Sequence, residues 1–417
     1  MKPCAKSISM PSEARHETAA AEHEPATNPS LTSLVVVGAS PPPVHGVVIM
    51  TGQLLAALGK LDACAGHLDI RDARPIDTVG RLDVRNVTLG LRHAWELNRM
   101  LARSHKAVGV HISVSQATWG FLRDAVFVGV VRLRRRRLYI QLHGGALADF
   151  HRRSNLPMRW LIRAVLQQAF QVWVLTPTLR AQFDGLVPAD RVHCIPNVVD
   201  DPLAGMPPAS SDQPEDATAL RILHLSNLLP EKGCFDLLAA LRLLGPESAD
   251  WEVRLVGEAS PAVEQRLRRE VAVLKEAGAA RVSLLGSLTG DSKSEQYGWA
   301  NVFAFPATGQ EGQPLVLLEA LGAGVPVVAT SQTGIGDTVA DGQEGLLIEP
   351  GDTRALAAAL MRLSREPELR KALSVNARAR YADCYKPDRL VGDLRKLLGP
   401  ISIERARWAS HAPNGGW

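Results

Sequence analysis

Two glutamates mark the segment of the chain with the strongest chemical signal. Glu311 lies ahead of Pro314, and Glu319 falls within the apolar run that this proline begins. Proline suits the first turn of a helix, because a residue there has no helical partner for its N–H. The backbone N–H groups of Gly312 and Gln313 then point off the helix N-terminus, where they favour an anion. The segment therefore offers amides for a phosphate and two carboxylates that can accept hydrogen bonds from hydroxyl groups.

An isolated pair of glutamates at this spacing is more often structural. Glu311 would then be a solvated loop residue, and Glu319 would pair with a basic side chain. The flanking sequence favours a ligand-binding role, because the pair brackets a helix that begins with proline. A Gly-x-Gly-x-Pro turn, Gly322–Pro326, then leads into a predicted buried strand.

A second segment carries a cation at the start of a predicted helix. Lys232 and Gly233 follow the predicted strand Leu220–Leu225 and precede the predicted helix Phe235–Leu244. A cation beside a helix N-terminus can bind a pyrophosphate. Lys-Gly is more commonly an ordinary exposed turn, but its place between this strand and this helix favours the phosphate role.

Histidine and glycine follow two strands that are predicted in the first half of the chain. His143 and Gly144 come directly after the strand Leu138–Leu142. Open α/β sheets bind ligands at the carboxyl ends of their strands, so His143 is a candidate for ligand contact. His45 and Gly46 lie in the loop after the first strand, where glycine allows close approach of the backbone to a ligand. The alternative for His143 is a structural histidine that caps a loop.

These residues require a scaffold of parallel strands. Short apolar, β-branched runs alternate with helical patterns, as in sheets that helices cover on both faces. The alternation fails between Asp200 and Thr218, in a segment rich in Pro, Ser and Asp. The predicted fold class is therefore α/β, with two Rossmann-like units joined by a hinge and a ligand site between them.

The predicted organisation has six parts. They are a leader over 1–30, a first domain over 31–200, a linker over 201–219, a second domain over 220–385, a helix over 386–398 expected to return to the first domain, and a tail over 399–417. The leader contains four prolines and lacks the apolar centre of a secretory signal. It is expected to be disordered.

Composition excludes several classes of protein. The 417 residues include 47 basic and 43 acidic side chains, for a net charge of +4, which is too low for a dedicated nucleic-acid binder. The five cysteines form no C-x-x-C pair, which disfavours a zinc cluster and is typical of a reducing cytoplasm. No apolar run has the length of a bilayer span. Common nucleotide, zinc-protease and hydrolase motifs are absent, and so is an Asp-x-Asp pair for a metal.

The segment EGQPLVLLEALGAGVPVVAT, residues 311–330, resembles the signature of glycosyltransferase family 4. That signature has two glutamates separated by seven residues, as Glu311 and Glu319 are. Residues 333–337 and 341–348 continue the likeness, which extends from about residue 31 to residue 398. The resemblance implies the GT-B architecture, in which two Rossmann-like domains face each other across a cleft. It also implies a retaining, nucleotide-sugar-dependent hexosyltransferase.

The resemblance implies a role for each candidate residue. The expected catalytic residues are His143, Lys232 and Glu311. The expected donor-binding residues are Gly46, Asn227, Lys232, Glu311, Gly312, Gln313, Pro314, Leu315, Val316 and Glu319, and the expected acceptor-side residues are His45 and Gly144. Lys232 would hold the donor diphosphate, Glu319 the ribose hydroxyls and Glu311 the donor sugar. Family members often carry arginine where this chain has Asn227. The difference indicates a variation within a subgroup, an arginine supplied from elsewhere in the chain, or a weak enzyme.

The resemblance also implies partners and a location. The donor is a nucleotide sugar, the acceptor a glycan or lipid-linked saccharide of envelope or exopolysaccharide synthesis, and neither a metal nor a cofactor is expected. Arginines cluster at Arg132–Arg137 and Arg152–Arg163. They form either a solvated face or a contact with an anionic membrane, which would attach a cytoplasmic protein to the inner membrane face. One alternative is a non-hydrolysing sugar-nucleotide epimerase. The other is a catalytically silent subunit of a polysaccharide-assembly complex, and Asn227 is the only feature of the sequence that favours this second alternative.

Overall fold

The strands of the chain form two parallel sheets in the computed structural model, which describes residues 31–42, 45–71, 84–104, 108–205 and 219–399. The residues from Leu31 to Gly399 make one compact unit. The predicted leader, residues 206–218 of the predicted linker and residues 400–417 of the predicted tail lie outside the described residues. The predicted domain boundaries therefore stay predictions.

The first sheet has the strand order β2-β1-β3-β4-β5-β6. Its strands are β1 (Leu34–Gly38), β2 (Cys64–Asp69), β3 (Gly109–Ser113), β4 (Leu138–Leu142), β5 (Gln171–Val174) and β6 (Val192–Cys194). The helices that accompany them are α1 (Gly46–Lys60), α2 (Val84–Arg103), α3 (Thr118–Leu133), α4 (Leu147–Arg153) and α5 (Leu156–Gln167), with short 3-10 turns η2 (Thr178–Phe183) and η3 (Ala189–Arg191).

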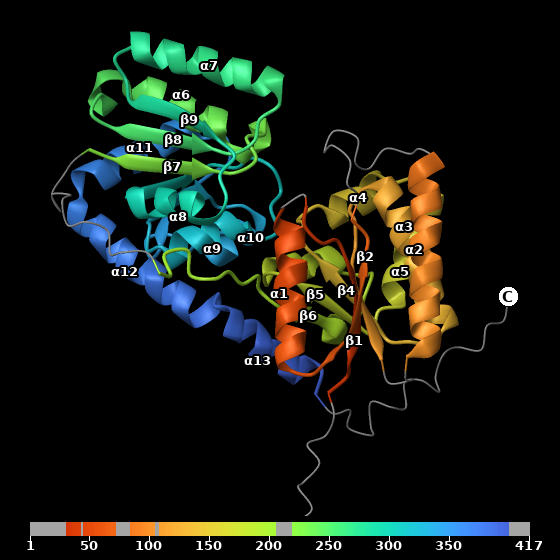
Figure 1. Ribbon diagram of the computed structural model, residues 1–417. Coiled ribbons are helices and arrows are strands. Elements are labelled where there is room, and N and C mark those ends of the chain that lie inside the picture. The colour runs from red at the N-terminus through yellow and green to blue at the C-terminus, as the bar shows by residue number, and fades with distance from the viewer. Residues whose placement is uncertain (1–30, 43–44, 72–83, 105–107, 206–218, 400–417) are drawn as a thin grey trace, which may run out of the picture. The chain divides into compact units, whose positions relative to one another are not determined.

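Strand β1 shows why this sheet is covered on both faces. All five of its residues are buried, and successive side chains point to opposite faces. Leu34 and Val36 belong to the apolar cluster that includes residues of α1. Val35 and Val37 belong to the cluster that includes residues of α2, α3 and α5. Figure 1 shows α1 and α2 on opposite sides of the sheet.

The second sheet has the order β12-β11-β10-β7-β8-β9. Its strands are β7 (Arg221–Leu225), β8 (Glu252–Val256), β9 (Arg281–Gly286), β10 (Val302–Phe305), β11 (Val327–Thr330) and β12 (Gly345–Ile348). Its helices are α6 (Cys234–Leu244), α7 (Pro261–Glu276), α8 (Gly290–Trp299), α9 (Leu315–Gly322), α10 (Thr333–Thr338), α11 (Thr353–Arg365) and α12 (Pro367–Cys384), with the 3-10 turns η4 (Pro230–Lys232) and η5 (Gly245–Ser248). Figure 1 shows α6 and α7 on one face and α8 and α9 on the other.

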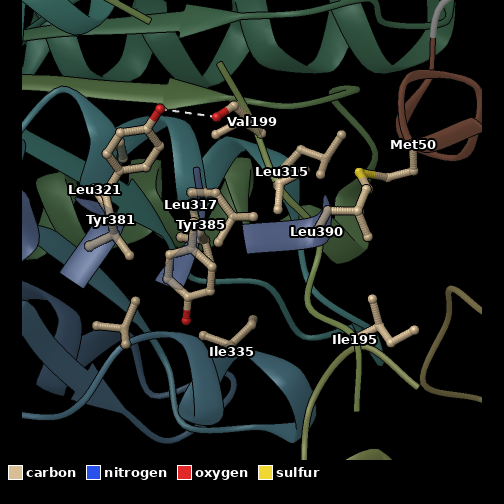
Figure 2. Close-up of a cluster of buried hydrophobic side chains, with 14 of the residues drawn as sticks. Met50, Ile195, Val199, Leu315, Leu317, Leu321, Ile335, Tyr381, Tyr385 and Leu390 are labelled. Atoms are coloured by element: carbon tan, nitrogen blue, oxygen red, sulfur yellow. Dashed lines mark hydrogen bonds between the residues drawn. The ribbon is translucent and has the colours of Figure 1, made fainter. Parts of the chain in front are cut away.

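One apolar cluster contains residues that pack against both sheets. Met50 of α1 and Ile195, which follows β6, belong to the same cluster as Leu317 and Leu321 of α9 (Figure 2). Tyr381 of α12 belongs to the same cluster, and its hydroxyl donates a hydrogen bond to the carbonyl oxygen of Val199 at 3.0 Å (Figure 2). We call this set the shared core.

The last helix of the described residues, α13 (Pro387–Leu397), packs against α1. Lys60 of α1 contacts Asp388 at 3.2 Å, and the Thr32 N–H donates to the Leu398 carbonyl at 2.9 Å. Among the helices described here, none combines the length and the apolar content needed to cross a bilayer.

The structure departs from the sequence-based elements in two instructive places. Strand β2 was not predicted, because it is an edge strand with Cys64 and Ala65 exposed and so lacks an apolar run. Pro314 was expected in the first turn of its helix, but it is the N-cap residue, and α9 begins at Leu315.

Candidate functional site

Lys232 and Glu311, from the two segments singled out in the sequence, contact each other directly. The Lys232 Nζ lies 2.5 Å from Glu311 Oε1. The side chains are 25% and 13% exposed, so the pair is shielded but reachable from solvent. The backbone joins the same loops, because the Thr308 and Gly309 N–H groups donate to the Glu231 carbonyl at 2.9 and 3.1 Å. The two segments therefore form one site.

Glycine is required for the turn that presents Lys232. Gly233 has a φ of +88°, in the left-handed region that glycine adopts without steric penalty. A Cβ atom there would lie less than 3.0 Å from the Pro306 carbonyl oxygen. The turn ends η4 and begins α6, so Lys232 sits beside the N-terminus of that helix.

Glu319 is a half-buried residue of α9, and two side chains of α8 contact it. Lys293 Nζ lies 2.5 Å from Glu319 Oε1, and the Tyr297 hydroxyl donates to Oε2 at 2.6 Å. The basic partner that the structural interpretation of Glu319 required is therefore Lys293. Burial, and then the Glu319 charge, raise the pKa of Tyr297 well above its usual range, so the phenol keeps its proton.

The side chain of Gln313 is already used within the protein. Its Oε1 accepts the Asn197 N–H at 2.7 Å, and its Nε2 donates to the Thr338 hydroxyl at 3.3 Å. Its carbonyl oxygen accepts a third hydrogen bond, from Asn197 Nδ2 at 2.9 Å. Gln313 thus connects the segment after β6 to the start of α9. The side chain is buried, and the backbone N–H takes no part in these three hydrogen bonds.

His143 lies where the loop after β4 meets the loop before α9. A Cβ atom on Gly312 would come within 3.0 Å of the His143 carbonyl oxygen, and one on Gly145 would lie 3.0 Å from the Glu311 carbonyl oxygen. His143 Nε2 is 3.2 Å from the Ser113 hydroxyl of β3. Burial, and then the charge of His45, lower the pKa of His143 to about 4. The imidazole is therefore neutral at pH 7 and can act through hydrogen bonds.

The other predicted site residues take different positions. His45 is the N-cap residue of α1. A Cβ atom on Gly46 would lie 3.8 Å from Leu315 Cδ1, an ordinary van der Waals contact. Leu315 is buried in the shared core, so it packs rather than presenting a polar contact. Asn227 is exposed in the loop after β7. Pro314, Val316 and Gly144 are partly buried around the same loops.

Sequence reasoning missed Lys293, Tyr297 and Ser113. No motif marks them, and α8 has little apolar periodicity that could have oriented it. The four-residue spacing of Lys293 and Tyr297 puts them on one helix face, but their target becomes visible only when α8 packs beside α9. Among the described residues, no group of three or more His, Cys, Asp and Glu side chains could hold a metal ion.

Comparisons with known proteins bear on the second sheet most directly. Residues 219–366 match the family model of glycosyl transferases group 1. An exopolysaccharide phosphotransferase of Streptomyces coelicolor is 32% identical over 190 residues, which are 45% of this chain and 19% of that protein. A GDP-mannose-dependent alpha-(1-6)-phosphatidylinositol monomannoside mannosyltransferase of Mycolicibacterium smegmatis is 26% identical over 66% of this chain and 74% of its own. Several curated relatives are matched over only 19% to 37% of their length.

A solved structure resembles the chain over a longer range. The Anabaena protein Alr3699/HepE, solved in complex with UDP, has a TM-score of 0.66 with 19% identity, over 88% of this chain and 99% of that chain. At this identity the likeness shows the fold. Together with the two parallel sheets, it confirms the predicted GT-B architecture.

Proposed function

We propose that the protein is a retaining glycosyltransferase that moves a sugar from a nucleoside-diphosphate sugar to a hydroxyl acceptor. The observation that carries the proposal is the contact of Lys232 with Glu311, which lies in the loop just before α9. A cation, a carboxylate and the N–H groups of a helix start then lie in one loop cluster. That combination suits a phosphate linked to a polyhydroxylated ring.

The proposed step breaks the bond between the anomeric carbon and the phosphate oxygen. Lys232 and the N–H groups at the start of α9 stabilise the charge that grows on the departing diphosphate. The acceptor oxygen bonds to the anomeric carbon from the same face, and its proton passes to the donor's phosphate oxygen. No side chain serves as the base in this scheme, and no metal is required.

Each side chain has a part in this scheme. An ammonium group has three N–H donors, so Lys232 can hold a phosphate oxygen while it remains bonded to Glu311. Glu311 accepts hydrogen bonds from the donor sugar, and Glu319 accepts those of the ribose. Neutral His143 orients the sugar from the first sheet. Asn227 brings no charge. Lys232 therefore neutralises the diphosphate without the arginine that family members often carry at the position of Asn227.

The relatives support the proposed acceptor class. One matched protein acts in exopolysaccharide chemistry and another on a phosphatidylinositol mannoside. We therefore propose a glycan or lipid-linked acceptor, met at the cytoplasmic membrane surface. The sugar-nucleotide epimerase and the silent subunit are weaker candidates, because among the described residues only Asn227 favours the silent subunit and none favours the epimerase.

The structure refines which arginines suit a membrane surface. In the run 132–137, Arg136 donates to the Leu101 and Ser104 carbonyls at 2.8 Å, and the Arg137 guanidinium lies 4.6 Å over the Phe170 ring. Those two serve the fold. The region 152–163 instead exposes Trp160 and Leu156 beside exposed arginines, a mixture typical of a membrane interface.

Removing the exposed arginines 152, 153, 159 and 163 together should weaken binding to anionic vesicles by about 100-fold or more, since each contributes about 1 kcal/mol near an anionic surface. The measurement is co-sedimentation with phosphatidylcholine vesicles, with and without phosphatidylglycerol, for the fourfold serine variant. A control with the same charge change replaces four exposed arginines of the second half by serine: Arg242, Arg268, Arg281 and Arg362. Equal binding by both variants would remove the membrane role.

A donor screen tests the proposed function itself. A ligand that binds only the folded protein raises its unfolding temperature according to its concentration over its Kd. We expect at least one of the UDP-, GDP-, ADP- and TDP-sugars to raise it, and EDTA to leave turnover unchanged. NMR of the product should show the donor's anomeric configuration. Inversion of that configuration, or a requirement for added magnesium, would contradict the retaining, metal-free scheme.

A further inference from the structure

Thr333 begins α10 with a backbone conformation that threonine rarely adopts. Its φ is +39°, in the left-handed region, where a residue with a branched Cβ atom is an outlier. Apart from glycines, the described residues with a positive φ are Thr333, Asp62 and Arg135, and only Thr333 has a branched Cβ atom. Strained backbone of this kind persists where the surrounding contacts hold it, and it clusters at functional sites.

The turn at Thr333 holds the loop that carries Glu311. The Thr333 hydroxyl donates to the Glu311 carbonyl oxygen at 2.8 Å, and the Gly334 N–H donates to the same oxygen at 3.4 Å. A Cβ atom on Gly334 would overlap the Gly312 carbonyl oxygen, so the two main chains are in direct contact. The carbonyl of Glu311 and the N–H of Gly312 belong to one planar peptide unit. The hydrogen bond from Thr333 therefore orients that N–H as well.

The residue before Thr333 binds the same loop nearer its start. Gln332 Nε2 donates to the carbonyl oxygens of Ala307 and Gly309 at 2.6 and 2.7 Å. The segment 332–334 thus contacts the loop 307–312 at several carbonyl groups. Within it, the strained residue is the one whose side chain binds the main chain of Glu311.

We infer that Thr333 is a positioning residue whose hydroxyl holds the main chain at Glu311 and Gly312, so that the carboxylate and the N–H group ahead of α9 meet the donor together. This inference rests on the proposed function of the site. Glu311 Oε1 lies 2.5 Å from Lys232 Nζ, so a shift of this main chain would also move the partner of the cation. A displacement of about 1 Å in a reacting site can lower turnover by about 100-fold.

The alternative is that Thr333 only starts α10. Its hydroxyl would then contribute to the stability of the fold, and each folded molecule would turn over at the wild-type rate. Glycine separates the two roles, because it adopts a positive φ without steric penalty and has no hydroxyl. Thr333→Gly therefore relieves the turn and releases the loop, so that turnover falls without a matching loss of stability.

Steady-state kinetics on the full chain test the inference with the donor found in the screen, well below the unfolding temperature of each variant. Thr333→Val keeps the branched shape and removes the hydroxyl. Thr333→Val and Thr333→Gly should each lower kcat by about 10-fold or more, whereas Thr333→Ser, which keeps the hydroxyl, should stay within about threefold of the wild type. The unfolding temperature of Thr333→Gly should equal or exceed that of Thr333→Val.

Hydrogen exchange followed by mass spectrometry gives a second readout that does not depend on turnover. The amides of residues 309–314 should exchange faster in Thr333→Val and Thr333→Gly than in the wild type and in Thr333→Ser. Thr353→Val makes the same side-chain change at the first residue of α11 and is the matched control. It should behave as the wild type in both measurements.

The outcomes separate the inference from the proposed function. Wild-type kcat in Thr333→Val, or an equal loss of kcat in Thr333→Ser, would overturn the inference and leave the proposed function standing. Faster exchange combined with wild-type kcat would overturn it too and assign Thr333 a structural role. A wild type that transfers sugar from none of the UDP-, GDP-, ADP- and TDP-sugars would overturn both.

Discussion

Lys232→Ala is expected to lower kcat by about 100- to 1,000-fold, the usual loss when one donor that stabilises a developing oxyanion is removed. The physical reason is that Lys232 is the cation in direct contact with Glu311 at the start of α9, and Asn227 brings no second charge to that loop. The measurement is steady-state kinetics with the donor found in the screen. The KM for the acceptor should change much less, because Lys232 belongs to the donor side.

The matched control for that variant is Lys275→Ala, which removes an exposed lysine of α7 far along the chain from these loops. It should keep wild-type kinetics. Lys232→Arg should recover part of the activity, since guanidinium also binds phosphate, although its shape differs from that of ammonium. Near-normal turnover by Lys232→Ala would contradict the role of Lys232 in leaving-group departure.

Gly233→Ala is expected to destabilise the protein by about 2 kcal/mol or more and to reduce activity with it. An alanine in the left-handed region costs about 1–2 kcal/mol. At Gly233, which has a φ of +88°, the added Cβ atom also meets the Pro306 carbonyl oxygen, which is backbone and cannot rotate away. The measurement is the free energy of unfolding from urea titration.

Gly278→Ala separates the two contributions. Gly278 has a φ of +64°, but a Cβ atom there has no neighbour within 4 Å. This control should show only the backbone penalty and leave turnover unchanged. If Gly233→Ala and Gly278→Ala lost the same stability, the close approach to Pro306 would have no energetic weight.

The sequence predicted the scaffold of the site well, because backbone chemistry leaves clear signals. Strands buried on both faces appear as apolar runs, and glycine or proline marks the turns at Gly233 and Pro314. The contact of Lys232 with Glu311 joins segments 79 positions apart, which the pairing of β7 with β10 brings close together. The edge strand β2 escaped prediction because its exposed residues break the apolar run.

Side-chain partners were harder to predict than positions. Gln313 was expected to serve the donor, yet its amide is bonded to Asn197 and Thr338. The sequence favoured a ligand as the partner of Glu319 over a basic side chain, and only the packing of α8 beside α9 supplies Lys293. These partners come from elements whose relative rotation is set by packing, which a linear pattern of residue types does not encode.

The shared core has a thermodynamic consequence. Leu317 and Leu321 of the second half pack in the same cluster as Met50 and Ile195 of the first, so neither half has a complete interior alone. Cutting the chain between the halves would expose these side chains to water, at about 25 cal/mol for each Å² uncovered. Heating should accordingly melt both halves in a single cooperative transition. If the second half were replaced by that of a relative, the protein would function only if the shared-core residues of the first half were exchanged as well.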